Sequence, residues 1–210
     1  MDIDEIGKLI ESAAQSDEWV QDEKYSVFAQ RDAHYYLKKK EQFEHKYRTF
    51  KAITNILRPA TIIELGTHAG SGAEAYLSGV GYDAHYTGYD SFGIARFDDG
   101  FDWDPRQRCI DMFRDRDYDA YKLIQCDLRD VREIPYADLI VVDAGHDYRN
   151  AYQDLLLALR SKPLYIHMDD YNGEDAQNAV RDILMNYPNL IEGMTRIDQW
   201  SGSALLEVSQ

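Results

Sequence analysis

One stretch of the sequence, residues 61–77, constrains the fold more than any other. A β-branched apolar run opens it and ends at Glu64 and Leu65. Three glycines follow closely: Gly66, Gly70 and Gly72. Apolar residues then return at helical spacing, so the stretch predicts a strand, a tight turn and a helix. Because glycine lets backbone amides approach a ligand and adopt positive φ angles, we expect a ligand at this turn.

The spacing of these glycines bears on the kind of ligand. A dinucleotide fingerprint, G-x-G-x-x-G, that began at Gly66 would need glycines at the positions of His68 and Ser71. This mismatch disfavours a nicotinamide cofactor. An NAD-linked oxidoreductase therefore remains only as an alternative enzyme class.

Strand and helix patterns alternate through the rest of the chain. We expect further strands at residues 84–90, 121–128, 137–143 and 164–168, and two shorter ones at 190–197 and 203–208. Asp104-Pro105 predicts the start of a helix, because Asp is a good N-cap and Pro fits the first helical position. This alternation predicts an α/β fold.

The residues before the first strand carry helical spacing. Two apolar faces are expected, one with Ile3, Ile6, Ile10 and Ala13 and one with Leu37, Phe43, Tyr47, Phe50, Ile53 and Leu57. Arg58-Pro59 ends the second helix. We therefore expect an N-terminal helical cap over residues 1–58 and one compact core over 59–210, a length that suits about one domain.

Charge and composition exclude several classes of function. Lys and Arg number 23 against 38 Asp and Glu, a net charge of −15 that repels nucleic acid. We find no run long and apolar enough for a membrane span and no signal-peptide pattern, so we expect a cytoplasmic protein with no membrane partner. Cys109 and Cys126 are expected to be reduced. A homo-oligomer is possible from the sequence.

The form E-x-G-x-x-x-G-x-G, which begins at Glu64, resembles motif I of the class I S-adenosylmethionine (SAM) methyltransferases. Asp90 lies 20 residues beyond Gly70, the separation at which open α/β sheets place a carboxylate on a ribose. The resemblance implies that Asp127 faces the adenine amino group. It implies a set of SAM-binding residues: Glu64, Gly66, Thr67, Gly70, Ser71, Asp90, Ser91, Asp127, Leu128 and Asp143. It also implies a Rossmann-like, mostly parallel seven-stranded sheet with helices on both faces.

Acidic residues gather where the expected strands end. Ligands bind beyond the carboxyl ends of parallel strands, so this edge would collect at least six carboxylates. They are Glu64, Asp90, Asp127, Asp143, Asp169 and Asp170. Crowded carboxylates repel one another unless they share a cation, and oxygen ligands suit Mg²⁺ or another hard divalent ion. We therefore expect Asp143, Asp169 and Asp170 to bind a metal ion.

The segment Val142-Asp-Ala-Gly-His-Asp-Tyr148, together with the Asp169-Asp170 pair, resembles the small metal-dependent O-methyltransferases. These include enzymes that act on antibiotic sugars and catechol-type relatives, and the resemblance covers roughly residues 60–172. Where such relatives often carry an acid that could serve as general base, this chain has Gly145. His146 becomes the candidate base instead, beside Asp143 as the catalytic metal ligand.

These patterns predict a SAM-dependent O-methyltransferase that acts on a small hydroxylated molecule, such as a sugar or phenol of a natural product. A divalent metal would lower the pKa of the acceptor hydroxyl, and His146 would take its proton. The loop at residues 92–102 is a candidate lid or substrate contact. A non-catalytic SAM-binding module with the same fold is the remaining alternative.

Overall fold

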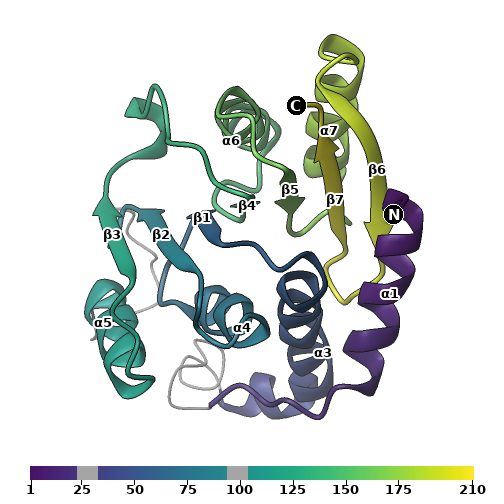
Figure 1. Ribbon diagram of the computed structural model, residues 1–210. Coiled ribbons are helices and arrows are strands. Elements are labelled where there is room, and N and C mark those ends of the chain that lie inside the picture. Colours follow the sequence, from purple (N-terminus) through teal and green to yellow (C-terminus); the bar gives the residue numbers. More distant parts are fainter. Residues whose placement is uncertain (23–32, 94–103) are drawn as a thin grey trace.

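A computed structural model of the chain describes residues 1–22, 33–93 and 104–210, which form a three-layer α/β arrangement (Figure 1). The sheet has seven strands in the order β3-β2-β1-β4-β5-β7-β6. They are β1 Thr61–Leu65, β2 His85–Asp90, β3 Tyr121–Gln125, β4 Leu139–Val142, β5 Tyr165–Met168, β6 Ile191–Ile197 and β7 Ser203–Val208. The first five strands pair in parallel, and β7 runs antiparallel to both of its neighbours. The predicted α/β fold with a mostly parallel seven-stranded sheet is confirmed.

Helices cover both faces of this sheet. They are α1 Ile3–Ser16, α3 Ala33–Leu57, α4 Ser71–Gly79, α5 Pro105–Asp115, α6 Tyr148–Arg160 and α7 Glu174–Asn186. Two buried apolar clusters result. One joins α1, α3, α4 and α5 to the sheet, and the other joins α6 and α7 to its opposite face. All four residues of β4 are buried, as the continuous apolar run predicted for a strand covered on both sides.

The N-terminal helices pack directly against the sheet rather than standing apart from it. Ile6 and Ile10 of α1 share an apolar cluster with Phe50 and Ile53 of α3. The Thr54 hydroxyl of α3 donates to the backbone oxygen of Tyr76 in α4 at 2.6 Å. The division at residues 58 and 59 stays a prediction, since both parts contribute to the same apolar cluster.

One detail of the expected helical faces is wrong. Leu37 is 68% exposed, because α3 is 25 residues long and its buried positions, of those described, begin only at Phe43. On α1, Ala13 packs against the apolar cluster as predicted, although it is only partly buried and Ala14 beside it is fully buried. The helical periodicity was sound, but it does not reveal where a neighbouring element stops covering the helix.

Two predicted boundaries concern loops near the carboxyl edge. The third strand ends at Gln125 rather than Leu128, because the Asp127 side chain accepts from the Arg129 amide and starts a short 3₁₀ turn, η1 Leu128–Asp130. The Asp104 side chain accepts from the Arg106 and Gln107 amides, which confirms the predicted start of α5. Most of the predicted lid at 92–102 lies outside the described residues.

No helix in the described part of the chain is long and apolar enough to cross a membrane.

Candidate active site

The glycine turn after β1 has the geometry that the sequence predicted. Gly66 and Gly70 adopt φ angles of +99° and +84°, in the left-handed region that favours glycine. A side chain at Gly66 would place its Cβ 2.2 Å from the backbone oxygen of Asp143. The turn therefore lies directly against the end of β4. Helix α4 starts at Ser71, immediately after Gly70, so its first amides face the carboxyl edge of the sheet, where anionic groups bind well.

Glu64 lies under this turn rather than at its surface. Its side chain is 1% exposed and accepts a hydrogen bond from the Tyr86 hydroxyl. A Cβ at Gly72 would meet the Glu64 Oε1 atom at 2.3 Å, so the carboxyl group lies against the first turn of α4. Burial raises the pKa of Glu64 to about 8, although the Tyr86 hydrogen bond acts in the opposite direction. Thr67 joins the same group, with its Oγ1 atom 3.1 Å from the Tyr86 hydroxyl oxygen.

Asp90 connects the glycine turn to the loop after β2. Its Oδ2 atom accepts from the His68 amide at 2.8 Å, and its Oδ1 atom accepts from the Phe92 amide at 2.6 Å. Ser91 Oγ lies 3.5 Å from Oδ1. The carboxylate is thus fixed at the carboxyl end of β2, and its Oδ2 atom keeps a further lone pair for a ligand. Its contact with a ribose stays a prediction.

Asp127 is engaged within its own loop. The Arg129 guanidinium donates to both of its carboxylate oxygens, and these hydrogen bonds lower the pKa of Asp127 to about 2. Leu128 follows directly in η1 and is half-buried against the apolar cluster under α6. The expected contact of Asp127 with an adenine amino group is a prediction that would require it to share its oxygens with Arg129.

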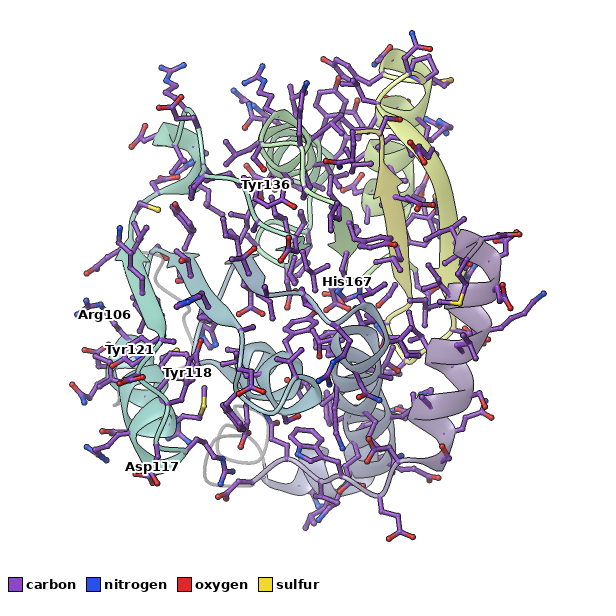
Figure 2. The ribbon with its side chains drawn as sticks, viewed as in Figure 1. Arg106, Asp117, Tyr118, Tyr121, Tyr136 and His167 are labelled. Atoms are coloured by element: carbon purple, nitrogen blue, oxygen red, sulfur yellow. The ribbon has the colours of Figure 1, made fainter. Side chains whose placement is uncertain are left out.

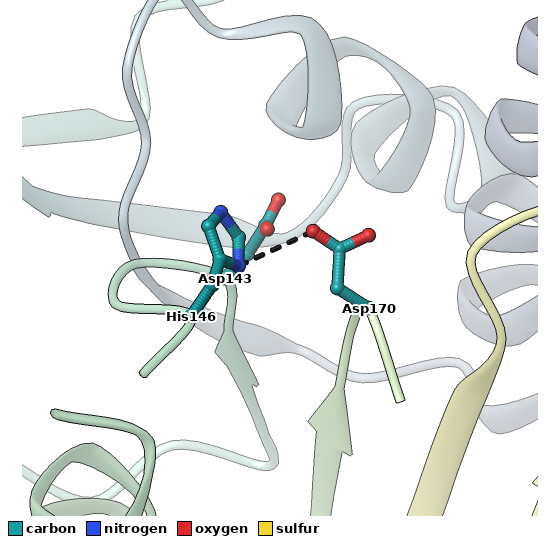
Figure 3. Close-up of side chains that lie close together, drawn as sticks. All are labelled: Asp143, His146 and Asp170. Carbon is teal, nitrogen blue, oxygen red and sulfur yellow. Dashed lines mark ion pairs between the residues drawn. The ribbon is translucent and has the colours of Figure 1, made fainter. Parts of the chain in front are cut away.

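Three side chains converge where β4 and β5 end (Figure 3). Asp143, His146 and Asp170 each offer a possible ligand atom, and these atoms all lie within 4.8 Å of one another. The His146 Nδ1 atom is 3.2 Å from the Asp170 Oδ2 atom. Asp170 has a φ angle of +52°, in the left-handed region that aspartate adopts more often than most residues other than glycine, and its side chain faces His146. The structure thus brings two of the three predicted metal ligands together with the predicted base.

Asp169, the third predicted metal ligand, has other partners. Its side chain is buried, and its Oδ2 atom lies 2.5 Å from the Lys46 ammonium nitrogen. Its Oδ1 atom accepts a hydrogen bond from the Gln199 amide at 3.0 Å. The Lys46 nitrogen is also 3.5 Å from the Asp170 Oδ1 atom. Both oxygens of Asp169 are therefore occupied by partners from α3 and from the turn before β7, although its charge still acts on the neighbouring Asp143.

Lys46 is a site residue that the sequence reasoning missed. It is 8% exposed on α3, and its ammonium nitrogen lies 5.5 Å from the centre of the Phe50 ring. A signal was present in the sequence, because Lys46 falls beside Phe43, Tyr47 and Phe50 on the apolar face of a predicted helix. A lysine in that position must find a partner or reach solvent.

The charges of this region are unbalanced. Burial raises the pKa of Asp143 well above its usual range, Asp169 and Asp170 raise it further, and Lys46 opposes them. Burial alone would lower the pKa of Lys46, but Asp169, Asp143 and Asp170 together raise it well above its usual value. One ammonium group thus faces three carboxyl groups, which leaves a site that favours a further positive charge.

The loop after β4 explains why this chain lacks an acid two residues after Asp143. A Cβ at Gly145 would lie 2.3 Å from the Cβ of Asn150, so a side chain does not fit there. The Gly145 amide hydrogen-bonds to the buried Asp154 carboxyl, whose pKa burial raises to about 7. The loop is thereby held against α6, and His146 is the next position that projects, with its side chain 62% exposed.

His167 lies in the interior on β5 (Figure 2). Its Nδ1 atom is 2.7 Å from the Tyr76 hydroxyl oxygen, and its ring packs edge-on against Phe50. Burial lowers the pKa of His167 to about 3, so the ring is neutral. It contributes to the layer beneath the site and offers no group to a ligand at the sheet edge.

The strand order and the glycine turn are those of the class I methyltransferase fold. Comparison with solved structures gives the same fold. The chain is similar to the methyltransferase PaMTH1 of Podospora anserina with SAH bound, with a TM-score of 0.68 and 14% identity over 100% of this chain and 97% of that one. The O-methyltransferase TomG of Streptomyces achromogenes in complex with SAM gives a TM-score of 0.63 and 13% identity, with both chains covered completely. The Bacillus cereus O-methyltransferase in complex with SAH gives 0.62 and 12%, over 98% of this chain and 100% of that one.

No protein-family model and no curated sequence matches the chain. The similarity is thus one of fold, at identities too low to carry a substrate across. The predicted Rossmann-like class I methyltransferase fold is confirmed.

Proposed function

We propose that this protein is a SAM-dependent methyltransferase that acts on a hydroxyl group of a small molecule. One observation carries the proposal. The glycine turn and the Asp143–His146–Asp170 group meet where Gly66 lies against the backbone of Asp143 and Ala144. A cofactor held by the turn would therefore present its methyl group next to side chains that can bind and deprotonate an acceptor. That several solved structures of this fold are O-methyltransferases supports the choice of oxygen.

The cofactor half of the site uses backbone amides and fixed carboxyl groups. We assign SAM to the turn and to the ends of β1, β2, β3 and β4, with the residues Glu64, Gly66, Thr67, Gly70, Ser71, Asp90, Ser91, Asp127, Leu128 and Asp143. Glu64 acts from beneath by supporting the turn, whereas Asp90 has a further lone pair on Oδ2 that can accept from a ribose hydroxyl.

The acceptor half has a donor set that fits a hard divalent cation. Asp143 and Asp170 supply oxygen atoms, and the surplus of carboxyl groups over the single Lys46 ammonium favours a cation of charge two. A bound divalent ion would supply Lewis acidity that lowers the pKa of an acceptor hydroxyl. Sugars and phenols are the acceptor classes that this chemistry suits.

His146 is our candidate for the proton acceptor. Its Nδ1 atom faces Asp170 at 3.2 Å, which favours the tautomer with the proton on Nδ1. The Nε2 atom then carries the free lone pair on a ring that is 62% exposed, and it can take the proton of an incoming hydroxyl. Asp170 would have two tasks, as an oxygen ligand and as the group that orients this ring.

Isothermal titration with SAM tests the proposal. Wild-type protein should bind SAM, and Asp90→Asn should weaken binding by about tenfold, because one charged acceptor is lost. Asp83→Asn is the matched control, since Asp83 is exposed in the turn before β2. Binding of NADH in place of SAM would instead support the oxidoreductase. SAM binding without turnover on a broad panel of sugar and phenol acceptors would support a binding module.

A further inference from the structure

Helix α3 places a positive charge inside the acidic edge of the sheet. The Lys46 ammonium nitrogen lies 2.5 Å from Asp169 and 3.5 Å from Asp170, and the lysine is 8% exposed. It comes from a segment more than 120 residues before its partners in the chain. A buried ammonium at this distance from a carboxylate forms an ion pair. Loss of either partner would leave a buried charge unpaired, which is strongly destabilising.

Asp169 is held from its other side as well. The Gln199 amide nitrogen that donates to Asp169 also lies 3.0 Å from the Gly202 oxygen and 3.0 Å from the Ser203 hydroxyl oxygen. The turn between β6 and β7 thus fixes the Asp169 side chain in the orientation that faces Lys46. A ligand role for Asp169 at the Asp143–His146–Asp170 group would require its oxygens to be shared with Lys46 and Gln199.

We propose that Lys46 is a resident cation of this site, which occupies Asp169 and restricts divalent-metal binding to the Asp143 and Asp170 side. This inference rests on the proposed function, because it concerns the metal proposed there. It differs from the ligand set expected from the sequence, in which Asp169 was a metal ligand. Lys46 thereby weakens metal binding in two ways, by its charge and by withholding a carboxylate.

The consequences can be measured with Mn²⁺, which substitutes for Mg²⁺ at oxygen sites and is followed by its electron paramagnetic resonance signal and by titration calorimetry. In Lys46→Gln the Asp169 carboxylate is released, and Mn²⁺ should bind at least roughly tenfold more tightly than to wild type, because one nearby positive charge is gone. Asp170→Asn, in contrast, should bind at least roughly tenfold more weakly.

The deciding variant is the double change Lys46→Gln with Asp169→Asn. It removes one positive and one negative charge that neutralise each other, so the protein keeps its net charge and avoids an unpaired buried group. If Lys46 holds Asp169 away from the metal, this variant binds Mn²⁺ within about threefold of wild type. If a thermal melt shows that Lys46→Gln alone does not fold, the double variant still tests the proposal.

Two results would overturn the inference. One is a double variant that binds Mn²⁺ at least tenfold more weakly than wild type, which would make Asp169 a ligand. The other is a failure of wild type and of folded Lys46→Gln to bind Mn²⁺ measurably, or an Mn²⁺ affinity of folded Lys46→Gln no higher than that of wild type. A SAM titration on the same samples separates this failure from failure of the proposed function, because SAM binding does not depend on which acid holds the metal.

Discussion

The two halves of the candidate site are built in different ways. The cofactor half, at the ends of β1 and β2, is held by backbone amides and by side chains within 30 residues of one another, such as Glu64, Tyr86 and Asp90. The acceptor half, at the ends of β4 and β5, depends on charged groups from distant segments, with Lys46 from α3 and Gln199 from the turn before β7. Local hydrogen bonds fix a backbone shape, whereas long-range charges set what the site attracts.

If the cofactor half depends on backbone shape, the largest effect should come from Gly66→Ala. The added Cβ would collide with the Asp143 oxygen and force a positive φ angle on alanine, at a cost of several kcal/mol. We expect loss of SAM binding and a clearly lower melting temperature. Gly81→Ala is the control, because Gly81 has φ +66° but no atom near its would-be Cβ. Equal effects of the two changes would show that strain alone matters.

In the acceptor half, His146→Ala should remove the proton acceptor and leave the cofactor half intact. We expect kcat to fall by about a hundredfold, within the range for loss of a general base, while the SAM dissociation constant stays within about twofold. His85→Ala, at an exposed position at the start of β2, is the control. A fall in SAM affinity as large as the fall in kcat would show that His146 also contributes to cofactor binding, so the two halves would not be separate.

The buried carboxyl group under the turn predicts a dependence of stability on pH. Folding raises the pKa of Glu64 from 4.5 to about 8, so the folded chain binds this proton more tightly than the unfolded chain. The contribution of Glu64 to stability is fully present below about pH 4.5 and is lost as pH rises toward 8, by about 1 kcal/mol per pH unit. Urea denaturation between pH 5 and 8 measures the slope, and Glu64→Gln should make it shallower. An unchanged slope in that variant would assign the effect to other acids, such as Asp154.

The smallest effect is expected at the edge of the cofactor half. Arg129→Ala would free the exposed Asp127 carboxylate from its ion pair and leave it available to an adenine amino group. We expect SAM to bind two- to threefold more tightly, because exposed pairs cost little to break. Calorimetry measures the change, with Arg132→Ala as the control at an exposed neighbour. Weaker binding in Arg129→Ala would mean that the arginine, and not Asp127, contacts the cofactor.

Much of the fold and of the cofactor half could be predicted from the sequence. The run from β1 through Gly72 carries its own geometry, since apolar strand residues, glycines and helical spacing follow one another without a gap. The acids at the strand ends were placed by the same logic. Periodicity is a local property, so it also located the helices, although not the exposed start of α3 at Leu37.

The acceptor half shows where this reasoning stops. Adjacent aspartates look alike in sequence, yet Asp170 faces His146 whereas Asp169 pairs closely with Lys46. Lys46 of α3 reaches both acids, but the Gln199 amide before β7 binds only Asp169. Gly145 was noted as a missing acid, but the reason, a contact with Asn150 in the first turn of α6, is visible only in the structure. Partners that are far apart in the chain leave no periodic signal.

The origin of the Lys46 charge has a consequence for work with fragments of this protein. A chain trimmed to begin at β1 would keep every strand, the glycine turn and all the rim aspartates, and by sequence it would look like a self-sufficient catalytic unit. It would nevertheless lack the ammonium group that offsets Asp169, so its acidic edge would repel itself. The shortest useful piece of this molecule therefore begins upstream of its first strand, at a helix that is part of the site's electrostatics.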